Sequence, residues 1–264
     1  VLRRVFHRLA IARPGELART AKAEASSAAV HGREAHASVL SWALDRSADA
    51  LTAADLAVLI DECIDLGRYD EAARALDEAE RRGLAGGAAP RARRIRTVEG
   101  AGFALRRATL LRRTGRAREA ERLLSSILRT AGTEPERARA TLDLADLALV
   151  RGDVPAAERA MKRLSRVPDE LFPRAAELRA RLALGRGDAA GAQSVLDEAF
   201  ARAAQPGESG EGPSASHRLW TLLGAVRERL GDRRGAVEAQ TTALAAAERE
   251  GNRHGAATSA ANRR

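Results

Sequence analysis

The residues that could do chemistry in this chain are few, and their spacing does not assemble a reactive site. His31 and His36 are five residues apart, so on a helix they lie on different faces, which does not suit two ligands of one metal ion. Cys63 is the only cysteine. It lies in an apolar helical pattern with no histidine near it in sequence, which predicts a packing residue rather than a nucleophile. We therefore expect no catalytic residue, no metal site and no cofactor.

Glycine-rich turns suggest two other functions, the binding of phosphate and the binding of an adhesion receptor. Gly185, Gly187 and Gly191 resemble a phosphate loop, but no Lys-Ser/Thr pair follows them and no predicted strand precedes them. The tripeptide Arg-Gly-Asp occurs at 151–153 and at 186–188, and both copies fall on a turn that recurs along the chain. We interpret these glycines as structural and expect that the chain is not an enzyme.

Arginine is the functional group that the sequence concentrates. Eleven arginines and three glutamates lie between Arg91 and Arg122, an excess of eight positive charges in a chain whose net charge is +9. Guanidinium groups can hold a carboxylate or a phosphate with two hydrogen bonds at once. The stretch therefore favours an acidic protein partner, or else nucleic acid. The alternative is an exposed arginine-rich helix without a specific partner, produced by a GC-rich genome.

Elsewhere, acidic and basic residues stand four positions apart. The pairs include Asp77 with Arg81, Glu158 with Lys162, and Glu177 with Arg181. On a helix such residues are neighbours, and each pair stabilises the helix by about 0.3 kcal/mol. We interpret these charges as solvated helix faces rather than as sites.

The elements that must position the arginines are helices. Apolar residues make up 45% of the 264 residues and aromatic residues only 3%, with alanine, leucine, arginine and glutamate dominant, which favours helices over sheets. Six segments share a glycine turn followed by a helix start that contains a small alanine. These alanines are Ala35, Ala72, Ala120, Ala157, Ala192 and Ala236, which are 35–48 residues apart. A period of this length predicts an α-solenoid.

Two segments resemble repeats of the tetratricopeptide repeat family. The first contains Leu66-Gly67, Tyr69, Ala72, Leu76 and Ala79, and the second contains Trp220, Leu223, Gly224 and Leu230-Gly231. The resemblance implies an all-α fold, a right-handed α-solenoid of antiparallel helix pairs with about six repeats. A different solenoid of helical hairpins is the alternative.

We predict a single solenoid domain over residues 1–264. Residues 1–14 would form a partial repeat, residues 15–250 six helix-pair repeats, and residues 251–264 a terminal or capping helix. The basic, amphipathic residues 1–13 would also suit an anionic membrane surface, although the partial repeat accounts for the same pattern. No apolar run approaches the length of a membrane span, and we expect a cytoplasmic protein.

In the family that the repeats resemble, the first helices of the pairs line a concave groove. Alignment on the repeat turn places Arg106, Arg112 and Arg113 toward that groove, with Asp61, Asp146 and Arg181 on neighbouring first helices. The family's carboxylate clamp relies on asparagines and lysines of first helices, whereas the only asparagines here are Asn252 and Asn262. Binding of a chaperone tail by such a clamp is therefore not expected.

Three hypotheses for the function follow. The first is a non-enzymatic protein–protein interaction scaffold whose groove binds a peptide or helix of a partner, with acidic residues facing the arginines. The second is a sensor or regulatory arm of a larger signalling ATPase, kinase or transcriptional regulator, because residues 243–257 resemble longer repeats of such bacterial proteins. The third is nucleic-acid binding through Arg91–Arg122, although Phe103 is the only aromatic residue there that could stack on a base.

Overall fold

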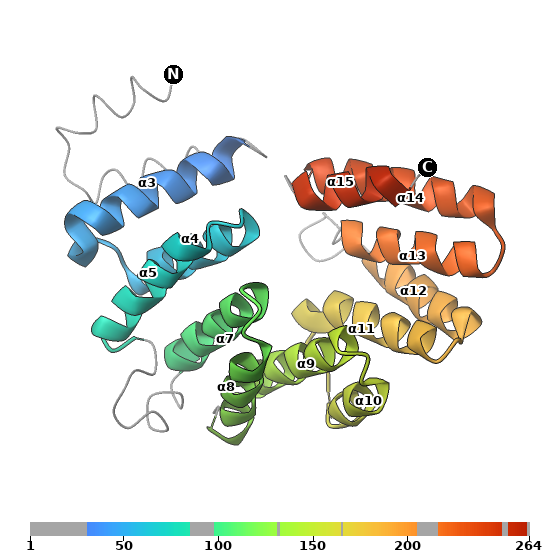
Figure 1. Ribbon diagram of the computed structural model, residues 1–264, viewed down its shortest axis with the longest axis horizontal. Coiled ribbons are helices and arrows are strands. Elements are labelled where there is room, and N and C mark those ends of the chain that lie inside the picture. Colours follow the sequence, from blue (N-terminus) through green and yellow to red (C-terminus); the bar gives the residue numbers. More distant parts are fainter. Residues whose placement is uncertain are drawn as a thin grey trace. The chain divides into compact units, whose positions relative to one another are not determined.

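The computed structural model describes residues 31–84, 98–130, 133–164, 166–204, 216–249 and 253–262. Every regular element in these ranges is a helix, which confirms the all-α class (Figure 1). The chain divides into two compact units, Val1–Arg137 and Ala138–Arg264, and each unit is taken by itself below. The partial repeat expected over residues 1–14 lies outside the described residues.

The described part of the first unit contains two complete helical hairpins. Its elements are α3 (His31–Ser47), a 3₁₀ turn (Ala48–Ala50), α4 (Ala53–Asp65), α5 (Tyr69–Arg81), α7 (Val98–Arg113) and α8 (Ala117–Thr130). Helices α4 and α5 form the first hairpin, and α7 and α8 form the second (Figure 1). Leu56, Leu59 and Ile60 of α4 are fully buried in one core with Leu76 of α5. Each hairpin thus buries an apolar face that a lone helix could not cover.

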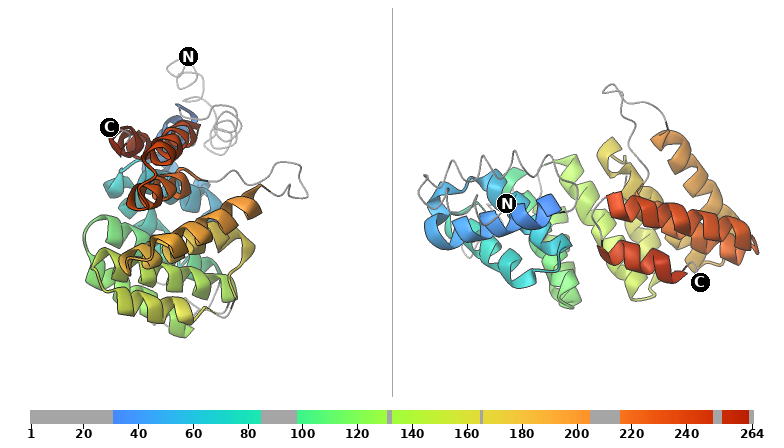
Figure 2. Two further views of the ribbon diagram at one scale, coloured as in Figure 1. Left: turned by 90° about the vertical axis from the view of Figure 1, so that its right-hand side faces the viewer. Right: turned by 90° about the horizontal axis from the view of Figure 1, so that it is seen from above.

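The second unit continues the same scheme. Its elements are α9 (Glu134–Val150), whose first residues belong to the first unit, α10 (Val154–Lys162), a 3₁₀ turn (Asp169–Leu171), α11 (Phe172–Gly185), α12 (Ala189–Ala203), α13 (His217–Arg229), α14 (Arg233–Arg249) and α15 (Arg253–Asn262). Helix α15 packs against α14 (Figure 2), within the residues expected to form a terminal or capping helix. The hydroxyl groups of Ser259 and Thr221 lie 3.2 Å apart and tie α15 to α13.

One turn geometry joins the two helices of each described hairpin. The glycine of the turn has a φ of 74–84° at Gly67, Gly115, Gly152, Gly187 and Gly231. The next residue donates its N–H to the carbonyl five positions earlier, as from Arg68 to Cys63 at 2.7 Å and from Asp188 to Ala183 at 2.9 Å. This hydrogen bond closes the first helix and requires the left-handed conformation that glycine adopts without strain. Five of the six predicted turns are therefore confirmed.

The sixth predicted turn, at Gly32, is wrong. Gly32 lies inside α3, which is already helical at His31. In this segment the glycine stands three residues before the alanine, whereas in the other five segments it stands five before. A separation of three residues places the two on the same face of one helix. Within the described residues, Gly32 therefore lies in a helix and is not a turn glycine.

The small residues after the turns are buried as the pattern predicts. Ala72, Ala120, Ala157 and Ala192 have no exposed surface, so the second helix of each hairpin lies close to the first. The last hairpin differs, because Ala236 is only half-buried. There the close approach is at Gly224, where an added Cβ would lie 2.4 Å from the amide nitrogen of the buried Gln240.

Candidate functional site

The structure brings four of the six predicted site residues together as two ion pairs, one in each unit. In the first unit, Nε of Arg106 on α7 lies 3.0 Å from both carboxylate oxygens of Asp61 on α4, and Nη2 lies 2.8 Å from Oδ2. In the second unit, Arg181 on α11 donates to Oδ1 of Asp146 on α9 at 2.5 Å. Alignment on the repeat turn therefore identified true neighbours. The charges, however, bind each other, so they are not free to bind a partner.

The pair in the second unit belongs to a larger network on α9, α11 and α13. Asp146 is 2% exposed and also accepts a hydrogen bond from Arg174 at 2.5 Å. Glu177 lies 2.9 Å from Arg174, 3.7 Å from Arg181 and 4.0 Å from Arg218. Burial lowers the pKa of Arg174, but Glu177 and Asp146 raise it by more, so the net pKa lies above its usual value. The network therefore ties three consecutive first helices together.

The other two predicted residues lie at the end of α7 and differ from each other. Arg112 is half-buried and has an interaction partner. Arg113 is exposed and has no ion pair with any residue that the structure describes. Of the three arginines expected to face a groove, Arg113 is thus the one whose guanidinium is available.

Within the basic stretch and the helix that follows it, three available arginines lie on the outer face of α8. Arg118, Arg122 and Arg129 are exposed, and none is ion-paired within the described part of the chain. The first and last are eleven residues apart, about 16 Å along a helix, and all three lie on one side of it. We call these three residues the α8 arginine face.

Two features keep the α8 arginine face free. The buried residues of α8, which are Ala120, Leu124 and Ile127, lie on the opposite side of the helix. The acidic neighbour Glu119 is held by Arg116 with two hydrogen bonds of 2.6 Å. The hydrogen bond from Arg116, with smaller contributions from the charges of Arg116 and Arg122, keeps the pKa of Glu119 below its usual value. Arg129 is not among the residues predicted from the sequence, because the predicted basic stretch ends at Arg122. The signal that was available is the spacing of four residues from Arg118 to Arg122 and of seven from Arg122 to Arg129.

The remaining candidates for chemistry are structural. Cys63 is completely buried, and burial, assisted by the nearby Glu71, raises the pKa of its thiol to about 11. Asp153 and Asp188, which end the two Arg-Gly-Asp tripeptides, accept backbone hydrogen bonds from Ala156 and Gly191 as helix caps. Among the described residues, no three His, Cys, Asp or Glu side chains are placed to hold a metal ion. Within the same ranges, no helix is both long and apolar enough to cross a membrane.

A family model and one solved structure agree with this architecture. Residues 111–182, from the end of α7 into α11, match the family model described as tetratricopeptide repeat. The crystal structure of BtubC (BKLC) from P. vanneervenii has a similar fold, with 20% identity and a TM-score of 0.51 over 86% of this chain and 91% of that one. A tetratricopeptide repeat protein from Parabacteroides merdae ATCC 43184 aligns over 94% of this chain and 98% of its own, with 14% identity and a TM-score of 0.47. No curated protein matches the sequence.

Proposed function

We propose, on the premise that the chain belongs to the tetratricopeptide repeat family, that it is a non-enzymatic scaffold that binds an acidic segment of a partner protein. Repeats of this family generally mediate protein–protein interactions. The acidic character of the partner is our inference from the charges on the surface. It rests on one observation, the unpaired α8 arginine face.

The α8 arginine face is suited to carboxylates because none of its three arginines is ion-paired with a residue in the described ranges. Exposed guanidinium groups at Arg118, Arg122 and Arg129 can each form a fork of two hydrogen bonds with an Asp or Glu side chain. A partner of Arg106 would first have to displace Asp61, which already occupies the same fork. The proposal therefore places the main contact on α8, counts Arg113 at the end of α7 as a further available cation, and gives Arg106 a role in joining α7 to α4.

The second unit carries a separate set of charges on its first helices. The side chain of Arg218 lies 4.0 Å from Glu177, a long distance for an ion pair, and is 42% exposed. It is therefore the most accessible member of the network. Arg181 is held by two carboxylates, Asp146 and Glu177. We propose that Arg181 and Asp146 fix the geometry of this surface and that Arg218 is the residue there that a partner carboxylate would meet.

Nucleic acid is the second candidate for the same arginines, since phosphates also accept guanidinium forks. One feature argues against it. Phe103, the aromatic residue of the basic stretch, is 3% exposed and belongs to the core of the first unit. It cannot stack on a base, so binding would rest on phosphate contacts alone and weaken steeply with salt. A role as the regulatory arm of a larger signalling protein stays a prediction from the sequence of the last repeat.

Capture from a nuclease-treated extract of the source organism tests the proposal. The variant Arg118→Glu/Arg122→Glu/Arg129→Glu should lose the proteins that the unchanged chain retains. The matched control reverses three exposed arginines of the second unit that have no ion pair with any described residue: Arg139, Arg159 and Arg233. The control has the same change in net charge and should keep the partner. Equal retention by both variants would contradict the proposal, and retention that disappears after nuclease treatment would favour nucleic acid.

A further inference from the structure

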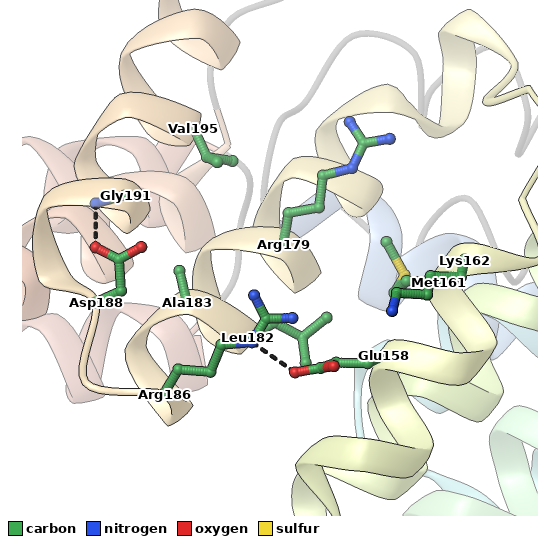
Figure 3. A pocket seen from close by; sticks show the side chains of 10 residues that line it. All are labelled: Glu158, Met161, Lys162, Arg179, Leu182, Ala183, Arg186, Asp188, Gly191 and Val195. Atoms are coloured by element: carbon green, nitrogen blue, oxygen red, sulfur yellow. Dashed lines mark hydrogen bonds and ion pairs between the residues drawn. The ribbon is translucent and has the colours of Figure 1, made fainter.

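The second unit contains a pocket of about 410 Å³ between α10, α11 and α12 (Figure 3). Helix α10, which forms one side of the pocket, is short: it has 9 residues, against 14 in α8 and 15 in α12. The last turn of α10 carries Met161 and Lys162, which form one wall (Figure 3). A volume of this size falls within the range of about 300–1,000 Å³ that ligand pockets usually occupy.

The pocket has an apolar lining. Leu182 and Ala183 of α11, Val195 of α12 and Met161 of α10 all contribute to it. Leu182 is 5% exposed, whereas the other three are half-buried and lie at the surface of the pocket. These side chains can remove an aliphatic group from water, which is favourable by about 25 cal/mol for each Å² of apolar surface buried.

The two carboxylates that line the pocket are already engaged. Glu158 stands four residues before Lys162, yet it accepts a hydrogen bond of 2.5 Å from Nε of Arg186 on the next hairpin (Figure 3). Asp188 accepts the backbone N–H of Gly191 at 2.7 Å and caps α12. Neither acid is therefore placed to neutralise Lys162.

Two cations of the pocket remain available. Lys162 on α10 and Arg179 on α11 are exposed, and neither has an ion pair or a side-chain hydrogen bond with any residue in the described ranges. They come from facing helices and line the same apolar pocket (Figure 3). The pocket thus combines two free positive charges with an aliphatic lining.

We propose that this pocket is a second docking site, which binds a protein segment where an aliphatic side chain stands beside acidic residues. The aliphatic side chain would pack on Met161, Leu182 and Val195, while carboxylates bind Lys162 and Arg179. The lining contains no aromatic residue on which a base could stack, so the chemistry favours a polypeptide over nucleic acid. This site is separate from the α8 arginine face and does not depend on it.

Met161 supplies a direct readout, because it is the only methionine of the chain. A full-length chain labelled with ¹³C at the methionine methyl group gives one resonance, and that resonance reports on the pocket. The probe is the end-blocked hexapeptide Asp-Glu-Leu-Leu-Asp-Glu. We expect its addition at millimolar concentration to shift the Met161 resonance saturably. The peptides Asp-Glu-Ser-Ser-Asp-Glu and Lys-Arg-Leu-Leu-Lys-Arg should leave the resonance in place.

Two variants identify the residues responsible. Lys162→Glu/Arg179→Glu should weaken binding of the probe at least about tenfold, because two contacts are replaced by two repulsions. Arg163→Glu is the matched control: Arg163 is exposed and adjacent to Lys162 but does not line the pocket. It should bind the probe within about twofold of the unchanged chain. The proposal is overturned if the probe leaves the Met161 resonance unmoved, if the serine peptide shifts it equally, or if the Arg163 variant loses as much affinity as the double variant.

Discussion

Gly115 and Gly102 of the α7–α8 hairpin should respond in opposite directions to the same substitution. Gly115 ends α7 with a φ of 79°, and a Cβ added there would meet nothing within 4 Å. Gly115→Ala therefore introduces no clash, and its entire effect is the strain of a left-handed alanine, about 1–2 kcal/mol of lost stability. Gly102 lies inside α7, and its added Cβ would be an ordinary 3.4 Å from Nη1 of Arg106. Gly102→Ala should therefore stabilise the helix, by up to about 1 kcal/mol.

Urea unfolding followed by circular dichroism at 222 nm measures both effects on one scale. The free energy of unfolding should be lower than that of the unchanged chain for Gly115→Ala and higher for Gly102→Ala, a difference of about 2 kcal/mol between the variants. The first substitution adds a conformational penalty, and the second raises helix propensity. Gly115→Asn is the control, since asparagine tolerates the left-handed region better than alanine does, and it should recover part of the loss. If Gly115→Ala and Gly102→Ala shift the unfolding midpoint in the same direction, the assignment of Gly115 to a helix-ending turn is wrong.

Three further predictions concern single groups. The thiol of Cys63 is buried and should not react with Ellman's reagent at pH 8 until the chain is unfolded. Its pKa in the folded chain is about 11 against the usual 9.0, so the stability that the protonated thiol provides should fall as the pH rises from 9 to 11. Hydrogen bonds from Arg81 and Arg82 lower the pKa of Glu78 to about 2. The stability that Glu78 provides is therefore complete above pH 4.5 and is lost as the pH falls toward 2. Glu78→Gln should remove about 2 kcal/mol of this stability at pH 7 in urea unfolding, and a loss unchanged at pH 2 would contradict the assignment. A double-mutant cycle of Arg106→Ala and Asp61→Ala should give a coupling of about 0.5–1 kcal/mol, since Asp61 is half-exposed, and a coupling of zero would show that the fork does not persist.

The hairpins could be predicted from the sequence because the signals that create them are local. A glycine with positive φ, the hydrogen bond across it and the small alanine that follows all lie within a few residues of each other, as at Gly67 and Ala72. The same locality explains the error at Gly32, where the glycine has the wrong distance from its alanine. Local pattern therefore identified every predicted repeat turn except the one at Gly32.

The free charges could not be predicted, because they depend on pairing between helices of different hairpins. Glu158 was expected beside Lys162 but binds Arg186, which is 28 residues away, and this leaves Lys162 free. Asp77 similarly lies 3.1 Å from Arg107. A basic side chain four residues away on the same helix and one from the next repeat compete for the same carboxylate. Which ion pair forms depends on how closely the helices pack. Aligning the turns predicts which residues are neighbours, as for Arg106 and Asp61, but not which of them remain unpaired.

The central claim is that the α8 arginine face binds an acidic protein. The direct measurement is the dissociation constant of the captured partner for the unchanged chain, for Arg118→Glu/Arg122→Glu/Arg129→Glu and for Arg106→Glu. Three lost contacts of about 1 kcal/mol each predict that the triple variant binds at least about 100-fold more weakly. Arg106→Glu should have a much smaller effect, because Asp61 already holds that guanidinium. A triple variant that binds as tightly as the unchanged chain, or an Arg106 variant that loses more affinity than the triple, would contradict the account.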